Sequence, residues 1–441
     1  MRQEISETSL EELVQEKSFA GTLASQSTVF FKLANRLRSL TADAWSKKHF
    51  FQLINEADDL ESFLDDYGAR YNRTFAYFTE LVASIRGFSQ AGYSITHLSG
   101  RLESYGTAGW IPAEDFKAAR SSVSRALEFI HGTLDKMLEA AAQEARALGV
   151  EITSESFPEE NFQPVAARRR LPRNVGQSEP EDEEQKIAEV ATKFLQACEM
   201  LRDVAVRRIA DEDERRDFFA RGCTEEQARV YEATVHNLQS TYDTHIQNTV
   251  LESRDARLPE LRGHASAALH LLEAVTHLVH FTERHEDEIR SEEAKHRIRQ
   301  LVRGPEVQDV ALNHLLVWAD RFLLTGSSVA EDLLPEYTNL QELELDLPPE
   351  LTLHARPVSL IVGIVNHFGT PVEMEVAGQR ANAASILELL VCVGSHPEQH
   401  SYVFRGDERP LRDIRLLFES GLGEGGLESL PEALSYLRGE R

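Results

Sequence analysis

The chain has 441 residues, 41% hydrophobic and 27% charged, which is enough for two to three domains with cores of their own. Its 47 basic and 73 acidic residues give a net charge of −26, so its surface repels nucleic acid and anionic lipid. No apolar run approaches the roughly 20 residues of a membrane span, and we expect neither nucleic-acid binding nor a transmembrane helix.

The cysteines and the first residues indicate the compartment. Cys198, Cys223 and Cys392 are an odd number and widely spaced, so they form neither a disulfide framework nor a zinc motif. Residues 1–4 lack the apolar core of a signal peptide. We therefore expect a cytoplasmic protein with reduced cysteines.

Residues 1–149 are expected to form an antiparallel bundle of about five helices. No proline occurs before Pro112, and apolar residues recur at helical spacing. The predicted helices are a short one over 9–18 with Ser9 and Glu12 in a capping box, one after Ser27 and Thr28, one from Phe50 to near Gly68, a helix or pair over 69–105, and a long one from Ile111 to Gly149.

Residues 150–183 are predicted to be a linker. The segment contains four prolines, an acidic run at 179–184 and a basic centre at 168–173. Charge runs of this kind are usually solvated, which favours a simple tether. The alternative is a docking site for an acidic partner, or a latch onto the acidic bundle.

Residues 184–335 are expected to form a second helical bundle or a coiled coil. Apolar residues keep helical spacing from Ile187 to Val204, and further helices are predicted at 225–251, 258–300 and 306–324. Such long helices make a homo-oligomer an expected state.

Histidines crowd residues 264–296, where metal binding must be considered. Glu273, His277 and His280 could share a helix face, as could His270 and His277. A di-metal site in a bundle needs Glu-x-x-His pairs from two helices, and the sequence has no matching second pair. We favour ordinary core-edge histidines, and we expect neither a metal nor a cofactor.

Residues 336–424 change to a mixed pattern of strands and helices. The predicted order is a strand around 343–347, a helix after Pro357, strands at 372–376 and beyond the Gly378 turn, a short helix after Ser385, a strand at 400–405 and a helix ended by Gly421. A glycine-rich hinge at 421–426 is expected to lead into the tail, 425–441, which contains a short helix at 431–438.

The segment 351–357 (LTLHARP) carries the candidate site. Pro357 suits a first helical position, so His354 should lie at or just before a helix N-terminus. Free backbone N–H groups and the positive end of the helix dipole make such a position an anion site. A histidine there could accept a phosphoryl group, and Arg356 adds a positive charge close by.

The chain from about 340 to 422 resembles HPr, the histidine-containing phosphocarrier of the bacterial phosphoenolpyruvate–sugar phosphotransferase system. The resemblance rests on Leu353-His354-x-Arg356-Pro357, on Ser385 thirty-one positions after His354, and on the order of elements. It implies an open-faced sandwich, in which helices cover one face of a four-stranded antiparallel sheet. It also implies that His354 accepts the phosphoryl group from a donor similar to enzyme I, that Arg356 stabilises the phosphate, and that a serine kinase acts on Ser385.

The sequence departs from this family at the surface around the histidine. Thr352 stands where the family usually has glycine, and the family's basic docking positions hold Gly363, Asn366, Ala384 and Glu388. Because charge complementarity guides docking, we favour a regulatory phosphorelay over bulk sugar transport, and a phosphocarrier with an unknown protein acceptor over a turnover enzyme.

Two alternatives stay open. In the first, the chain is a helical scaffold or interaction protein whose HPr-like domain is a binding module that is not phosphorylated. In the second, the helical part is an enzyme or metal protein that the C-terminal domain regulates, and only the histidines of 264–296 support it.

Overall fold

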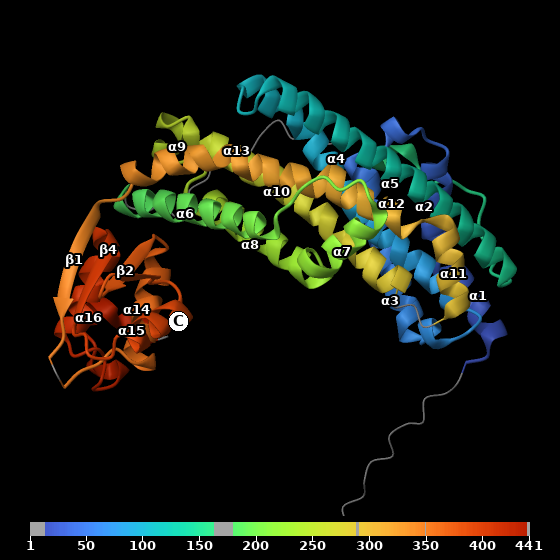
Figure 1. Cartoon of the computed structure of the whole chain (residues 1–441). Coiled ribbons are helices and arrows are strands. Elements are labelled where there is room, and N and C mark those ends of the chain that lie inside the picture. The colour runs from blue at the N-terminus through green and yellow to red at the C-terminus, as the bar shows by residue number, and fades with distance from the viewer. Residues whose placement is uncertain (1–13, 163–179, 288–290, 349, 439–441) are drawn as a thin grey trace, which may run out of the picture. The chain divides into compact units, whose positions relative to one another are not determined.

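The computed structural model of the chain describes residues 14–162, 180–287, 291–348 and 350–438. It is mostly helical, with a four-stranded antiparallel sheet near the C-terminus (Figure 1). Contacts divide the chain into unit 1, drawn from 1–170, 206–232 and 269–319, and unit 2, drawn from 171–205, 233–268 and 320–441. Across the described ranges, no helix has the length and apolar character needed to cross a membrane.

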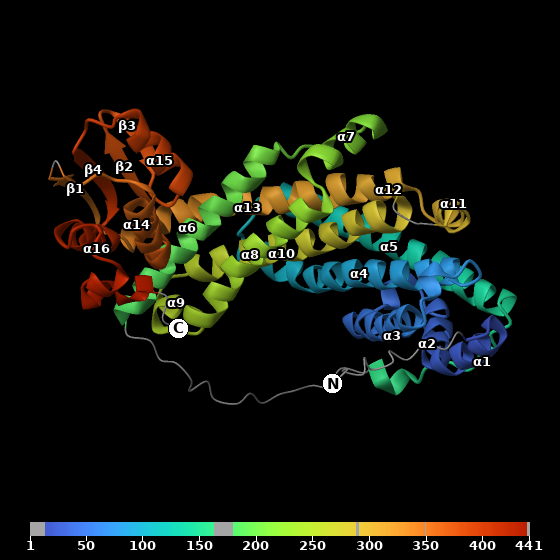
Figure 2. The same ribbon diagram turned by 90° about the horizontal axis from the view of Figure 1, so that it is seen from below.

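Unit 1 begins with the predicted bundle. Its long helices α4 and α5 lie side by side (Figures 1 and 2), and α3 packs against α4. The helices are α1 (Glu16–Gln26), α2 (Thr28–Arg38), α3 (Lys47–Asp66), α4 (Ala76–Ala108) and α5 (Ala113–Ala147).

The predicted ends of these helices are confirmed where glycine or proline marks them. Pro112 precedes α5, and the backbone at Gly68 and Gly149 has positive φ values of 65° and 76° beyond the ends of α3 and α5. The first helix was misplaced: α1 begins at Glu16 and runs to Gln26 instead of ending at 18. The proposed capping box of Ser9 and Glu12 lies outside the described residues.

The middle of the chain differs most from the prediction. The helix α6 (Pro180–Val204) begins inside the predicted linker, whose basic centre at 168–173 lies outside the described residues. The predicted helix over 225–251 is two helices, and those over 258–300 and 306–324 are interrupted by π-helical segments. The elements are α8 (Glu225–His245), α9 (Val250–Arg254), α10 (Arg257–His280), η4 (Phe281–Asp287), α11 (Glu292–Leu301), α12 (Gly304–Asp309), η5 (Val310–Leu316) and α13 (Val317–Leu333).

One helix, α7 (Glu212–Gly222), was not predicted. It is rich in charged residues and lacks an apolar stripe, so periodicity gives no signal for it. It begins because the Asp211 carboxylate accepts hydrogen bonds from the backbone N–H groups of Asp213 and Glu214.

The C-terminal part of unit 2 has the predicted order of strands and helices. The sheet order is β1-β4-β2-β3, with every neighbouring pair antiparallel. The elements are β1 (Leu340–Asp346), α14 (Ala355–Phe368), β2 (Val372–Val376), β3 (Gln379–Asn382), α15 (Ile386–Ser395), β4 (Ser401–Asp407) and α16 (Glu408–Glu419).

One face of this sheet is buried and the other is charged. Leu343, Phe404, Met374 and Ala381 are paired across the four strands and are all buried. The helices α14 and α16 lie on that face (Figure 2). On the opposite face, Arg405 forms ion pairs with carboxylates of β1 and β2. The alternation of side chains along each strand therefore produces a sheet with helices on one side.

The chain after α16 is packed instead of forming the open hinge that we expected at 421–426. The N–H groups of Gly421 and Leu422 donate to the carbonyls of Phe418 and Leu417, which closes α16 with a Schellman motif. Leu430 and Leu434 of the tail are buried in the domain core. The predicted terminal helix is the 3₁₀ helix η8 (Glu432–Arg438).

Candidate functional site

His354 lies at the N-terminus of α14, as the sequence predicts. Its backbone is extended, and it is the N-cap residue of the helix. The buried side chains of Leu353 and Pro357 hold the backbone on either side of it. Its own side chain is half exposed. The imidazole is therefore fixed in place and open to a partner.

The two ring nitrogens of His354 have different surroundings. Nδ1 accepts a hydrogen bond from the backbone N–H of Arg356 at 3.4 Å. Nε2 lies 2.7 Å from Oε1 of Glu424, seventy residues further along the chain. Because an ionised carboxylate only accepts hydrogen bonds, this contact assigns the proton to Nε2. The lone pair of Nδ1 then faces the N–H groups at the start of α14.

Arg356 provides an unneutralised positive charge beside this histidine. Its side chain is exposed, and within the described part of the chain it makes no ion pair. Its backbone N–H belongs to the first helical turn, where it has no acceptor within the helix and donates to Nδ1 of His354 instead. Together with the helix dipole, the guanidinium makes this end of α14 favourable for a dianionic group.

Ser385 lies at the start of α15, where its hydroxyl accepts a hydrogen bond from the N–H of Glu388 at 3.3 Å. Beside it, α15 exposes a group of large apolar side chains: Ile386 is 46%, Leu387 72% and Val391 54% exposed. Phosphate on Ser385 would thus add charge at the edge of an apolar surface.

Replacing Ser385 by alanine should destabilise the start of α15 by about 1 kcal/mol, because the Glu388 N–H loses its cap. Replacement by aspartate keeps an acceptor oxygen and should cost little. Hydrogen exchange of the backbone amides in α15 measures both effects. Equal exchange rates in the two variants would show that the serine hydroxyl does not stabilise the helix.

The four positions at which the HPr family has basic docking residues face other parts of unit 2. Gly363 lies beneath Leu437 of the tail, since a Cβ atom placed on it would be 2.9 Å from Leu437 Cδ2. Asn366, Ala384 and Glu388 line a cleft of about 450 Å³, whose other wall is formed by residues of α6. The same helix approaches α14 at Gly369, where an added Cβ would lie 2.5 Å from Glu189 Cγ.

In the histidine-rich stretch, His270 contacts a carboxylate and a second imidazole ring. His270 Nδ1 lies 2.9 Å from Glu273 Oε2, and its ring is 4.4 Å from that of His97. Burial lowers the pKa values of His97 and His277 to about 4. In the part of the chain that the structure describes, no group of three or more histidine, cysteine or carboxylate side chains is placed to hold a metal ion.

Glu225 organises a second polar cluster of unit 1. His280 Nδ1 and Arg284 Nε each lie 2.9 Å from its carboxylate oxygens, and Arg229 is 2.8 Å away. Although burial raises the pKa of Glu225, hydrogen bonds from Arg284, Arg229 and His280 lower it to about 2. His280 therefore points toward this ion pair, and it does not join His277 and Glu273 in a shared site.

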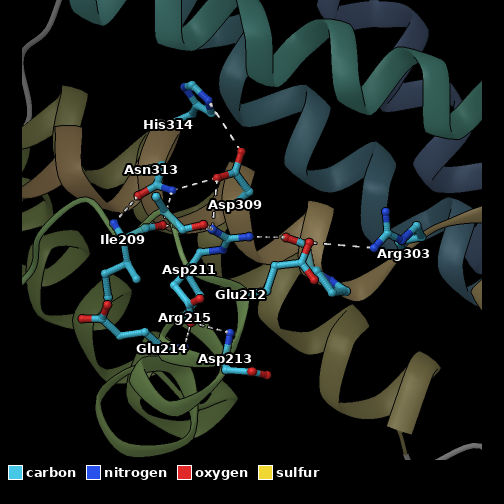
Figure 3. Close-up of polar contacts among 12 residues, drawn as sticks. Ile209, Asp211, Glu212, Asp213, Glu214, Arg215, Arg303, Asp309, Asn313 and His314 are labelled. Atoms are coloured by element: carbon cyan, nitrogen blue, oxygen red, sulfur yellow. Dashed lines mark hydrogen bonds and ion pairs between the residues drawn. The ribbon is translucent and has the colours of Figure 1, made fainter.

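A third polar cluster, which sequence analysis missed, ties the segment before α7 to η5 (Figure 3). The amide of Asn313 accepts from the N–H of Ile209 and donates to the carbonyl of the same residue, both at 2.9 Å. The buried Arg215 donates to the carbonyls of Ile209 and Ala210. These bonds satisfy the backbone groups of the buried Ile209 within an irregular segment, so we assign the cluster a structural role. No spacing in the sequence indicates it, since its members are about a hundred residues apart.

Comparison with known proteins finds no family model, no curated protein and no solved structure that matches this chain.

Proposed function

We propose that the C-terminal domain is an HPr-like phosphocarrier that accepts a phosphoryl group on Nδ1 of His354. The observation that carries the proposal is the position of His354 as N-cap of α14, with its Nδ1 lone pair directed at the first turn of the helix. The order of elements and of strands agrees with the open-faced sandwich that the HPr resemblance implies.

The proposed reaction moves one phosphoryl group from a nitrogen or oxygen atom of the donor to Nδ1 of His354. The lone pair of Nδ1 attacks phosphorus, the bond from phosphorus to the donor atom breaks, and the donor keeps that electron pair. The proton on Nε2 stays in place. The N–H of Arg356, which donates to Nδ1 in the free domain, becomes available to a phosphoryl oxygen, and the guanidinium of Arg356 adds a charged donor.

The proposed role is regulatory phosphorelay or signalling. Three of the positions that would dock acidic partners in the HPr family instead line the cleft with α6, so the domain presents this surface to its own helical part. A phosphorylated histidine can bias such a contact only if the two states bind the helices differently. The partners proposed are a donor similar to enzyme I, a serine kinase for Ser385 and a protein acceptor.

We expect acid-labile phosphate on the full-length protein after incubation with phosphoenolpyruvate, enzyme I and Mg²⁺. The His354→Ala variant should lose all of this label, because it removes the ring nitrogen proposed as the acceptor. His396→Ala, which removes a partly exposed histidine of the same domain, should keep it. Label that survives in His354→Ala would overturn the assignment of the acceptor.

The second candidate function is a binding module without phosphate transfer. The exposed apolar side chains of α15 favour it, because such a group is typical of a surface that binds another protein. Absence of label with both a general and a dedicated donor, together with capture of a partner that Leu387→Asp abolishes, would support this alternative over the phosphocarrier.

A further inference from the structure

The contact between Glu424 and His354 depends on an uncommon backbone turn. Gly421, Leu422 and Gly423 are consecutive and all have positive φ, at 76°, 60° and 72°. This conformation is unfavourable for leucine, yet the Leu422 side chain is completely buried, which offsets the cost. The turn directs the next residue, Glu424, back toward the start of α14.

The tail beyond Glu424 fixes the other end of this turn. Tyr436 stacks on His367 with ring centroids 3.8 Å apart, and its hydroxyl donates to Asp413 at 2.8 Å. Leu430 and Leu434, which lie between Glu424 and Tyr436 in the sequence, are also buried. The carboxylate at position 424 is therefore held between two anchored segments, and its placement 2.7 Å from Nε2 is a built feature of the domain.

We propose that Glu424 is a positioning residue for His354. By accepting the Nε2 proton, its carboxylate holds the imidazole in the tautomer whose lone pair is on Nδ1, and it fixes the orientation of the ring. The consequence for phosphoryl transfer rests on the function proposed above, whereas the tautomer can be measured independently of it.

The position of the carboxylate suits the charge that develops during transfer. When Nδ1 bonds to phosphorus, the ring gains positive charge that is shared with Nε2–H. Glu424 lies on the Nε2 side, whereas the phosphoryl group enters on the opposite side, toward Arg356. The carboxylate can thus stabilise the imidazolium without occupying the place of the phosphate.

The test is the ¹⁵N spectrum of the full chain labelled in histidine, recorded where the imidazoles are neutral. His354→Gln identifies the signals of His354 by their loss. We expect the wild type to be predominantly Nε2–H, and Glu424→Ala to lower the ratio of Nε2–H to Nδ1–H about fivefold, as removal of a charge-assisted hydrogen bond implies. Glu428→Ala, which removes an exposed carboxylate from the same tail, should leave the ratio unchanged.

The outcomes separate this proposal from the phosphocarrier itself. The same ratio in the wild type and in Glu424→Ala overturns the positioning role, whether or not His354 takes up phosphate. A changed ratio in a protein that takes up no label keeps the positioning role and removes the carrier. If the signal of His367 also moves in Glu424→Ala, the tail has shifted. Glu424→Gln keeps the size of the side chain, and its ratio of Nε2–H to Nδ1–H is then compared with the wild type in place of that of Glu424→Ala.

Where label is found, its rate of appearance gives a second readout. Glu424→Ala should slow labelling about tenfold, since the tautomer and the developing charge both lose their partner. Glu428→Ala should label at the wild-type rate. A merely structural glutamate would change neither the tautomer ratio nor this rate.

Discussion

Replacement of Gly92 by alanine is expected to destabilise unit 1 by roughly 1–3 kcal/mol, the range for overpacking a close-packed core. A Cβ atom at this position of α4 would lie 2.2 Å from Cε1 and 2.7 Å from Cζ of Phe50. Phe50 belongs to α3, is completely buried and packs against the rings of Trp45 and His131. Either this buried ring or the α4 backbone therefore has to shift.

Gly87 provides a matched control in the same helix. No atom outside the helix backbone lies within 4 Å of a Cβ placed there, so Gly87→Ala should stabilise unit 1 by about 0.5–1 kcal/mol through helix propensity. Denaturant unfolding followed by tryptophan fluorescence measures both variants, because all three tryptophans lie in unit 1. Equal unfolding midpoints for the two variants would mean that α3 and α4 are not packed this closely.

The close approach at Gly92 shows where sequence reasoning ends. Proline gaps and helical spacing predicted α3, α4 and α5, because those signals act within one helix. Whether a glycine in a helix marks a contact with another helix depends on a residue such as Phe50, forty-two positions away. Gly87 and Gly92 are equivalent in the sequence, and the neighbouring helix alone makes them different.

The candidate site likewise has features that the sequence predicts and features that depend on distant residues. The N-cap position of His354 and the cap at Ser385 were predictable, because a few adjacent residues determine each. Glu424 was assigned to a hinge, since its partner is seventy residues earlier and only the packed tail brings the two together. The π-helical segment η5 also escaped prediction, because its apolar residues are compatible with an ordinary helix.

The second large effect is expected for Gly423→Ala, which should destabilise the tail and release Glu424 from His354. Alanine at a φ of 72° costs roughly 1–2 kcal/mol, because its Cβ crowds the following carbonyl. Its Cβ would also lie 2.7 Å from Cδ1 of Leu360 on α14, which is buried and has to shift. We therefore expect a total of about 2–4 kcal/mol, measured as faster hydrogen exchange of the amides in 421–438.

Gly421→Ala separates the two contributions. Its φ of 76° carries the same backbone cost, but no atom lies within 4 Å of an added Cβ. It should therefore destabilise the tail by only about 1–2 kcal/mol. If Gly423→Ala exceeds Gly421→Ala and also shifts His354 away from the Nε2–H tautomer, contact of the turn with α14 is what places the Glu424 carboxylate. If the two variants exchange equally and the tautomer is unchanged in both, Glu424 reaches His354 without that contact, and the anchored tail alone determines its position.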